Sequence, residues 1–201
     1  MTTLADVRSD VGALLASAVD SLTWTTSLLD AAIRLGLSEV DGCLVYESDV
    51  TVTTADYEQD LSAIPDLLGV LALAYPWTAG ADFGRRLVAW RWVGFGRVYF
   101  DVAEAQVGEV IRVRHTKRHT LTDLDGAVTT TLPGVYQPLL ALAAAAWACD
   151  LRRRQLSENP AAPQEATGVL AEVAAAYRNE VARRLARSQS QPGPVWADLG
   201  L

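Results

Sequence analysis

The order of its predicted elements most constrains what this chain can fold into. Apolar residues at helical spacing fill both ends of the chain, and alternating β-branched residues fill the middle. We therefore predict an α+β fold, in which a bundle of about four helices has a β-sheet or small β-sandwich inserted between its second and third helices. The predicted domains are residues 1–42 and 132–187 for the helical bundle, 43–131 for the β-rich insertion and 188–201 for an extended C-terminal tail.

Capping residues and apolar spacing bound the first two helices. The threonines at 2–3 precede a helix that runs towards Val19, and those at 25–26 precede one that ends near Asp41-Gly42. The residues expected on the buried faces are Leu4, Val7, Val11, Leu14 and Leu15 in the first helix, and Leu28, Leu29, Ile33 and Leu37 in the second.

From Cys43 onward the apolar period changes to two, which predicts strands. Strands are expected around Val50–Val52 and at Tyr57–Ile64, Leu67–Tyr75, Leu87–Val93, Arg97–Val102 and Glu109–His115. The segment Leu67–Tyr75 is apolar enough for a strand buried on both faces. Leu87–Val93 and Arg97–Val102 are expected to pair as a hairpin through residues 94–96.

The final third of the chain is predicted to be helical. Pro138 suits the first turn of a helix that is apolar on all sides, so this helix should be central and buried. Its apolar run, Leu139–Cys149, is too short to cross a bilayer at about 1.5 Å per residue. A last helix is expected from about Gln164 to Arg187, with Val169, Val173, Tyr177, Val181 and Leu185 repeating every four residues.

Charge and cysteine content narrow the functional classes. A formal net charge of -7 argues against general phosphate binding. Cys43 and Cys149 lie in apolar contexts and are expected to be buried free thiols, which fits an intracellular origin. Asp6, Arg8 and Asp10 interrupt the N-terminus, so no signal peptide is expected.

The search for catalytic, cofactor and metal residues gives none. Residues 94–96 contain two glycines of a dinucleotide motif but lack the third. Asp123–Gly126 resembles part of a calcium loop without its first acidic ligand, which favours a plain turn. His115 and His119 are expected on a strand and a loop with no cluster of further ligands, which argues against zinc. We expect no enzyme activity.

One basic segment has two interpretations. Residues 112–119 contain six basic or histidine side chains in a chain of charge -7. They can form a solvated strand edge, which such charges protect from unwanted pairing. Alternatively, Arg112, Arg114 and Arg118 contact an acidic surface of a neighbouring subunit or protein.

The C-terminal tail also has two interpretations. Residues 188–194 have the composition of a linker, and apolar residues follow them. The tail can be a disordered end. Alternatively, it is a tethered peptide whose anchors Val195, Trp196, Leu199 and Leu201 dock on a partner.

The C-terminal half of the chain also resembles a known family. A strand Glu-Val-Ile-Arg-Val-Arg (residues 109–114) is followed by a linker containing Leu121, Thr122 and Asp125 and by Thr-Thr-Leu-Pro-Gly-Val-Tyr-Gln-Pro-Leu-Leu (residues 130–140). An alanine-rich helix comes next, and then a helix whose Tyr177 is expected to face the bundle. In these motifs and in element order, the chain from about Leu4 to Arg187 resembles head-to-tail adaptor (connector or head-completion) proteins of tailed bacteriophages.

This resemblance implies a structural virion protein with no cofactor. The expected assembly is a ring of about twelve subunits under the portal protein. The ring extends the DNA channel and docks the next neck or tail protein, and DNA passes without sequence-specific binding. The implied location is the virion neck, after assembly in the host cytoplasm, with no membrane contact.

The alternative function is a cytoplasmic small-ligand-binding or regulatory domain. Its expected pocket is lined by Trp90, Trp92 and Trp147. The genes beside the gene for this protein would separate the two functions, because neighbouring portal and capsid genes would favour the adaptor.

Overall fold

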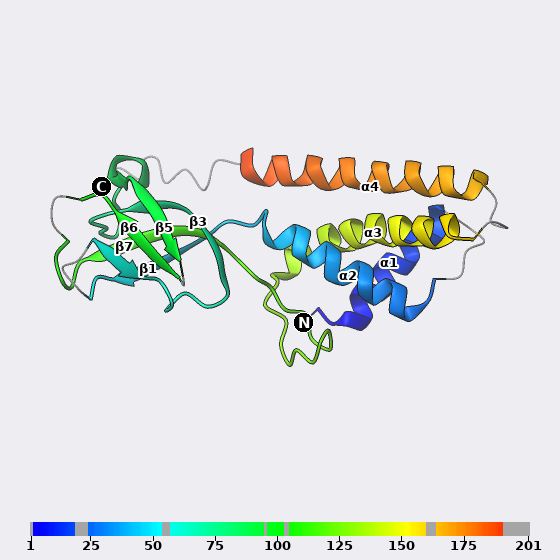
Figure 1. Ribbon diagram of the computed structural model, residues 1–201, viewed down its shortest axis with the longest axis horizontal. Helices are drawn as coiled ribbons and strands as arrows, with labels where there is room; N and C mark the ends of the chain where they lie inside the picture. The colour runs from blue at the N-terminus through cyan, green and yellow to red at the C-terminus, as the bar shows by residue number, and fades with distance from the viewer. Residues whose placement is uncertain are drawn as a thin grey trace, which may run out of the picture. The chain divides into compact units, whose positions relative to one another are not determined.

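The computed structural model contains four α-helices and two antiparallel sheets among the residues it describes, which confirms the α+β class (Figure 1). The described residues are 2–18, 24–53, 57–94, 96–102, 105–159 and 164–190. The chain divides into two compact units, which we call unit 1 (Met1–Val40 with Thr120–Leu201) and unit 2 (Asp41–His119). Residues 120–131, which were expected in the β-rich insertion, thus belong to the helical unit.

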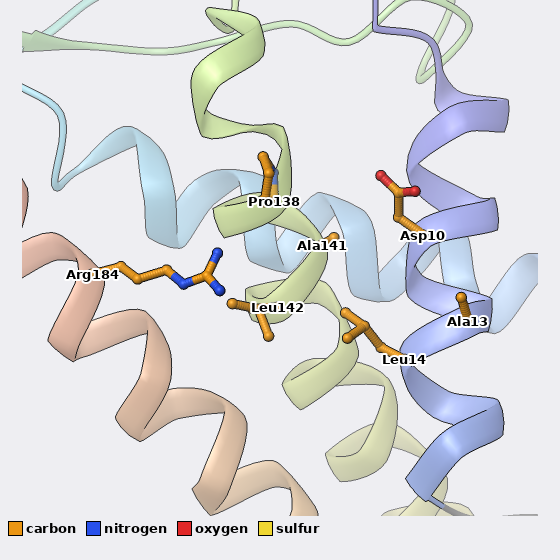
Figure 2. Close-up of a pocket in the computed structure, with 7 residues that line it drawn as sticks. All are labelled: Asp10, Ala13, Leu14, Pro138, Ala141, Leu142 and Arg184. Atoms are coloured by element: carbon orange, nitrogen blue, oxygen red, sulfur yellow. The ribbon is translucent and has the colours of Figure 1, made fainter.

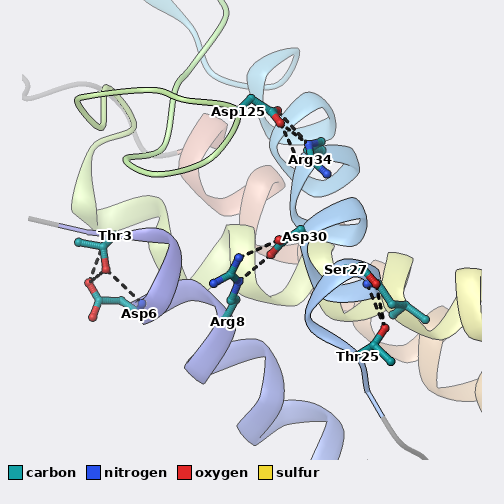
Figure 3. Close-up of polar contacts among 9 residues, drawn as sticks. Thr3, Asp6, Arg8, Thr25, Ser27, Asp30, Arg34 and Asp125 are labelled. Atoms are coloured by element: carbon teal, nitrogen blue, oxygen red, sulfur yellow. Dashed lines mark hydrogen bonds and ion pairs between the residues drawn. The ribbon is translucent and has the colours of Figure 1, made fainter.

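Helix α1 (Leu4–Ala18) begins with a reciprocal cap, as Figure 3 shows. The Thr3 hydroxyl accepts a hydrogen bond from the backbone N–H of Asp6 at 3.2 Å. In return, the Asp6 carboxylate accepts from the backbone N–H of Thr3 at 2.8 Å. Each side chain therefore satisfies a donor at the helix start, which is the physical reason that the sequence predicts this boundary correctly.

Helix α2 (Thr26–Asp41) is capped by Thr25, whose hydroxyl accepts from the backbone N–H of Leu28 at 3.3 Å. Arg8 of α1 joins the two helices by donating to both carboxylate oxygens of Asp30 in α2, at 2.6 and 2.7 Å (Figure 3). The predicted apolar faces are buried at Leu4, Val7, Val11, Leu15, Leu28, Ile33 and Leu37. Leu14 and Leu29 are half-buried.

Helix α3 (Gln137–Ser157) is the central element of unit 1. It follows a short 3-10 helix, η2 (Gly134–Tyr136), and has Pro138 in its first turn. Its buried residues are Leu139, Leu140, Ala141, Leu142, Ala143, Ala144, Ala145, Ala146, Ala148, Cys149 and Asp150. The prediction of a central, buried helix is confirmed.

Helix α4 (Gln164–Ser190) lies alongside α3 (Figure 1). Its buried residues are Leu170, Ala174 and Val181, and the Tyr177 hydroxyl donates to the Leu14 carbonyl of α1 at 2.8 Å. The predicted four-residue stripe is wrong at its start, because Val169 is 44% exposed. Each four-residue step advances about 40° around a helix of 3.6 residues per turn, so such a repeat leaves the buried face.

Unit 2 contains both sheets (Figure 1). The first has the order β1-β7-β3-β4, formed by β1 (Tyr46–Thr51), β7 (Val110–Lys117), β3 (Leu67–Ala74) and β4 (Leu87–Val88). The second has the order β2-β6-β5, formed by β2 (Glu58–Asp60), β6 (Arg97–Phe100) and β5 (Trp90–Gly94). A 3-10 helix, η1 (Phe83–Arg86), precedes β4.

One hydrophobic core joins the two sheets of unit 2. Leu73, Ile111 and Val113 of the first sheet and Val98 and Phe100 of the second are all 0% exposed and belong to one cluster. Alternate residues of β6 and of β7 therefore face this core. Burying these side chains stabilises each sheet through the other.

The predicted strand Leu87–Val93 is split between the sheets. β4 pairs with β3, and β5 pairs antiparallel with β6 in the predicted hairpin. Ala89 lies outside both strands, and a chain that bends at such a point can pass from one sheet to the next. The alternating sequence pattern alone does not reveal this break, because the pattern continues on both sides of Ala89.

Two further strand predictions need correction. The segment Tyr57–Ile64 forms only the short β2, because the Asp60 carboxylate accepts from the backbone N–H of Ser62 at 2.8 Å and turns the chain. β3 is not buried on both faces, since Leu68 is 42% and Leu71 50% exposed.

Candidate functional site

The arginines of the basic segment lie on β7 opposite the carboxylates of β1. The register places Arg114 across from Glu47 and Arg112 across from Asp49. Arg112 binds Asp49 at 2.7 Å and Glu47 at 3.1 Å, and Arg114 binds Glu47 at 2.7 Å. Burial acts to raise the pKa of Glu47, but hydrogen bonds from both arginines hold it below its ordinary value. These two arginines therefore have acidic partners within unit 2.

Aromatic rings contact the same guanidinium groups. The Arg112 guanidinium carbon lies 5.2 Å from the centre of the Trp77 ring, and that of Arg114 lies 4.3 Å from the centre of Phe83. Cation–π contacts of this kind hold arginines in place. Arg118 differs, because it follows the strand and is exposed. Of the three predicted partner-binding arginines, it is the most accessible.

The two histidines of the basic segment are buried rather than exposed. His115 is 1% and His119 2% exposed. A His119 ring nitrogen, Nε2, hydrogen-bonds the Tyr46 hydroxyl at 2.7 Å. Burial, and then the nearby Lys117 ammonium, lower the pKa of His115. His115 is therefore uncharged at neutral pH and adds nothing to a basic surface.

These histidines belong to a polar cluster in unit 2, made of the buried Asp41, His115 and His119 and the half-buried Tyr46 and Ser48. Asp41 Oδ1 accepts the backbone N–H of His119 at 3.0 Å, and burial raises the pKa of Asp41 to about 6. Ser48 Oγ lies 3.1 Å from His115 Nε2, as a nucleophile and its base do. However, His115 Nδ1 has no hydrogen-bond partner among the described residues, so no carboxylate orients the ring as in a triad.

The described residues contain no group of three or more histidine, cysteine, aspartate or glutamate side chains able to hold a metal ion. Asp123–Gly126 forms the predicted turn, with positive φ at Asp123, Asp125 and Gly126. The Asp125 carboxylate pairs with Arg34 of α2 at 2.6 Å (Figure 3). In the part of the chain that the structure describes, no helix combines the length and apolar character needed to cross a membrane.

Three helices of unit 1 line an apolar groove, as Figure 2 shows. It has a volume of about 420 Å³. Its lining comes from three helices: Asp10, Ala13 and Leu14 of α1, Pro138, Ala141 and Leu142 of α3, and Arg184 of α4. We call this site the unit 1 groove.

The polar residues of the unit 1 groove stand on opposite sides of its apolar floor (Figure 2). Asp10 Oδ2 accepts a hydrogen bond from the side chain of Gln137 at 2.7 Å. Arg184 Nε donates to the Glu180 carboxylate at 2.7 Å. The groove can therefore bind an apolar group that has a donor on one side and an anionic group on the other.

Sequence reasoning missed this groove because its lining residues come from three distant parts of the chain. The exposed fraction of Ala13 and the inward direction of Arg184 are set by helix–helix packing, which no local pattern encodes. The predicted tail anchors Val195, Trp196, Leu199 and Leu201 lie outside the described residues.

The tryptophans of the alternative pocket lie in two different units. Trp90 and Trp92 belong to β5 of unit 2, and Trp147 belongs to α3 of unit 1. Trp147 is half-buried, with its indole N–H donating to Glu39 at 2.8 Å. The Arg178 guanidinium carbon lies 5.3 Å from its ring centre.

Comparisons with known proteins add no relative. No protein-family model matches the chain. A search of curated proteins gives no match either. Function is therefore inferred from the fold and from the surfaces of the chain itself.

Proposed function

We propose that the protein is a head-to-tail adaptor of a tailed bacteriophage. The supporting observation is the order of its elements: α1 and α2 come before unit 2 in sequence, α3 and α4 come after it, and both pairs belong to unit 1. A helical bundle with a β insertion between its second and third helices is the arrangement implied by the family resemblance.

In this role the subunits form a ring of about twelve copies under the portal protein. The ring extends the DNA channel and offers a surface to the next neck or tail protein. The net charge of -7 supports the role, because an acidic protein has little attraction for the phosphates of the passing duplex. The protein acts in the virion neck and assembles in the host cytoplasm.

The contacts proposed for this assembly are Arg118 and the C-terminal tail. Arg118 is exposed, whereas Arg112 and Arg114 form ion pairs within unit 2 and contribute less net attraction to an outside partner. The tail supplies the apolar anchors Val195, Trp196, Leu199 and Leu201. Together they offer one electrostatic contact and one hydrophobic contact to the portal or a neighbouring subunit.

The decisive experiment is reconstitution with the portal protein of the same phage or prophage. Purified protein and portal are mixed, separated by size and imaged by cryo-electron microscopy. The expected result is a ring of this protein bound to the portal ring, while the protein alone stays monomeric or weakly associated. A stable dimer that ignores the portal contradicts the proposal.

A truncation tests the role of the tail in the same assay. Removing residues 191–201 leaves α4 intact to Ser190 and should weaken portal binding, and Trp196→Ala should reproduce most of the loss. Val169→Ala is a matched control, since this side chain is apolar, 44% exposed and on α4, outside the tail. Equal portal binding by the full and truncated chains rules out the tail as a contact.

For the ligand-binding alternative, Trp90 and Trp92 of the expected pocket belong to unit 2 and Trp147 belongs to unit 1. We prefer the adaptor because the order of the elements supports it.

A further inference from the structure

The unit 1 groove lies beside the end of α4. Its α4 residue, Arg184, comes fewer than two helical turns before Ser190, where the helix ends. That interval is about 9 Å at 1.5 Å per residue. The next residues, 191–194, are Gln-Pro-Gly-Pro, which span about 13 Å when extended. A chain that turns back after Ser190 can therefore reach the groove with its next residues.

The chemistry of residues 195–201 matches the groove. Their sequence is Val-Trp-Ala-Asp-Leu-Gly-Leu. An indole ring suits an apolar floor, but its N–H needs an acceptor when it is buried. The groove has such an acceptor in the Asp10 carboxylate on one side. On the other side, the Arg184 guanidinium can pair with Asp198, which follows Trp196 by two residues.

We propose that the unit 1 groove binds residues 195–201 of its own chain. Trp196 packs against Leu14 and Leu142, with its indole N–H directed to Asp10, and Asp198 pairs with Arg184. The volume of about 420 Å³ lies within the range of sites that enclose small organic groups. The inference concerns the free subunit, and in the adaptor role proposed above the tail would leave this groove to reach the portal or a neighbouring subunit.

The short connection favours the chain's own tail over the tail of a second copy. A segment joined to its site by a short linker experiences an effective concentration of the order of millimolar. At micromolar protein concentration, a tail from another molecule competes at about a thousandfold disadvantage. Binding within one chain is therefore expected to be independent of protein concentration.

Fluorine NMR of the full chain tests the proposal. The protein is labelled with 5-fluorotryptophan, its six tryptophans give separate ¹⁹F signals, and Trp196→Phe identifies the signal of Trp196. The expected signal lies away from the random-coil position. Ala13→Glu places a carboxylate in the groove and should return this signal to the random-coil position. Ala5→Glu is the matched control, because Ala5 is exposed on the same helix and does not line the groove.

A second pair of variants tests the ionic contact. Arg184 and Arg183 both bind Glu180, but only Arg184 lines the groove. Arg184→Ala should move the Trp196 signal towards the random-coil position, and Arg183→Ala should not. Circular dichroism checks that each variant is folded, and the arginine pair decides the question if Ala13→Glu unfolds the protein.

Three results overturn the proposal. The first is a Trp196 signal already at the random-coil position in the unmodified chain. The second is a displaced signal that neither Ala13→Glu nor Arg184→Ala moves, which places the ring elsewhere. The third is a displacement that appears only as concentration and molecular mass rise together, which places the tail in the groove of another copy.

Discussion

Gly36 of α2 lies directly against the backbone of Ala144 in α3. A methyl group added at Gly36 would stand 2.8 Å from the Ala144 nitrogen and 3.1 Å from its Cα. Ala144 is 0% exposed, so its backbone has no free space into which it can move. The missing side chain at position 36 therefore sets how closely α2 and α3 approach.

We predict that Gly36→Ala destabilises the protein. Alanine gains about 1 kcal/mol over glycine from helix propensity. Overpacking against a buried backbone costs about 1–3 kcal/mol, and the 2.8 Å contact places this site in the upper part of that range. The free energy of unfolding, measured by urea denaturation, should therefore fall.

Gly12→Ala is the matched control for Gly36→Ala. Gly12 lies inside α1, and a methyl group there meets no atom within 4 Å. This variant should raise the free energy of unfolding by up to about 1 kcal/mol. If both variants stabilise the protein equally, α2 and α3 do not approach at Gly36.

Arg178→Ala should destabilise unit 1. Arg178 pairs with Asp150, whose side chain is only 10% exposed, and it also covers Trp147. Without Arg178, the Asp150 carboxylate keeps only the longer contact to Arg153 at 3.4 Å among its ion pairs with described residues. We therefore expect the free energy of unfolding to fall by about 1–3 kcal/mol. Thermal unfolding measures the loss. Arg183→Ala, which breaks an exposed pair on the same helix, should leave the unfolding temperature unchanged.

Asp41 should make stability depend on pH. Burial raises its pKa from 3.8 to about 6, so the folded protein binds a proton more tightly than the unfolded chain between these values. The contribution of Asp41 to stability therefore falls as pH rises from about 4 to about 6 and stays low above that. Asp41→Asn keeps the acceptor for the His119 N–H and removes the buried charge. It should raise the free energy of unfolding at pH 7 by on the order of 2 kcal/mol.

Urea denaturation of both proteins at several pH values checks this prediction. The lowered pKa of His115 acts in the opposite direction below pH 6.5, but both proteins contain it, so their difference isolates Asp41. Asp66→Asn is the control, because Asp66 is exposed and has a φ of 56° that asparagine tolerates. A constant stability difference from pH 4 to 7 contradicts the raised pKa.

Arg118→Glu should weaken assembly with the portal if the adaptor proposal holds. The substitution would place a negative charge opposite an acidic partner, and the resulting loss of binding should be smaller in high salt. Co-sedimentation with the portal measures it. Arg86→Glu changes another exposed arginine of unit 2 and should have no effect on portal binding. An equal loss of portal binding in both variants would indicate an effect of net charge rather than a contact at Arg118.

The helices could be predicted because their signals are local. Thr3 and Thr25 cap the first two helices through hydrogen bonds to residues three positions away, and Pro138 lies in the first turn of the third. The split of β4 from β5 depends on which sheet each half joins. β4 pairs with β3 and β5 pairs with β6, and the residues around Ala89 do not reveal these partners.

The sites were harder to predict than the elements. Basic residues at 112–119 suggested one exposed surface, but the strand alternation and the loop geometry place His115 and His119 inside. Arg112 and Arg114 lie across from carboxylates of β1, a relation set by strand register. Composition shows that these residues are charged but not which residues they pair with. Because Arg112 and Arg114 are paired within unit 2, the exposed Arg118, which follows the strand, is left as the candidate for contact with a partner.

The division of unit 1 between the two ends of the chain has a consequence for synthesis on the ribosome. Residues 41–119 emerge complete and can fold before α3 has been translated. The apolar faces of α1 and α2 have no α3 to cover them during that interval. At roughly 5–20 residues per second, the wait lasts several seconds or more. In the cell, the newly made first helices are therefore the part of the chain most in need of a chaperone.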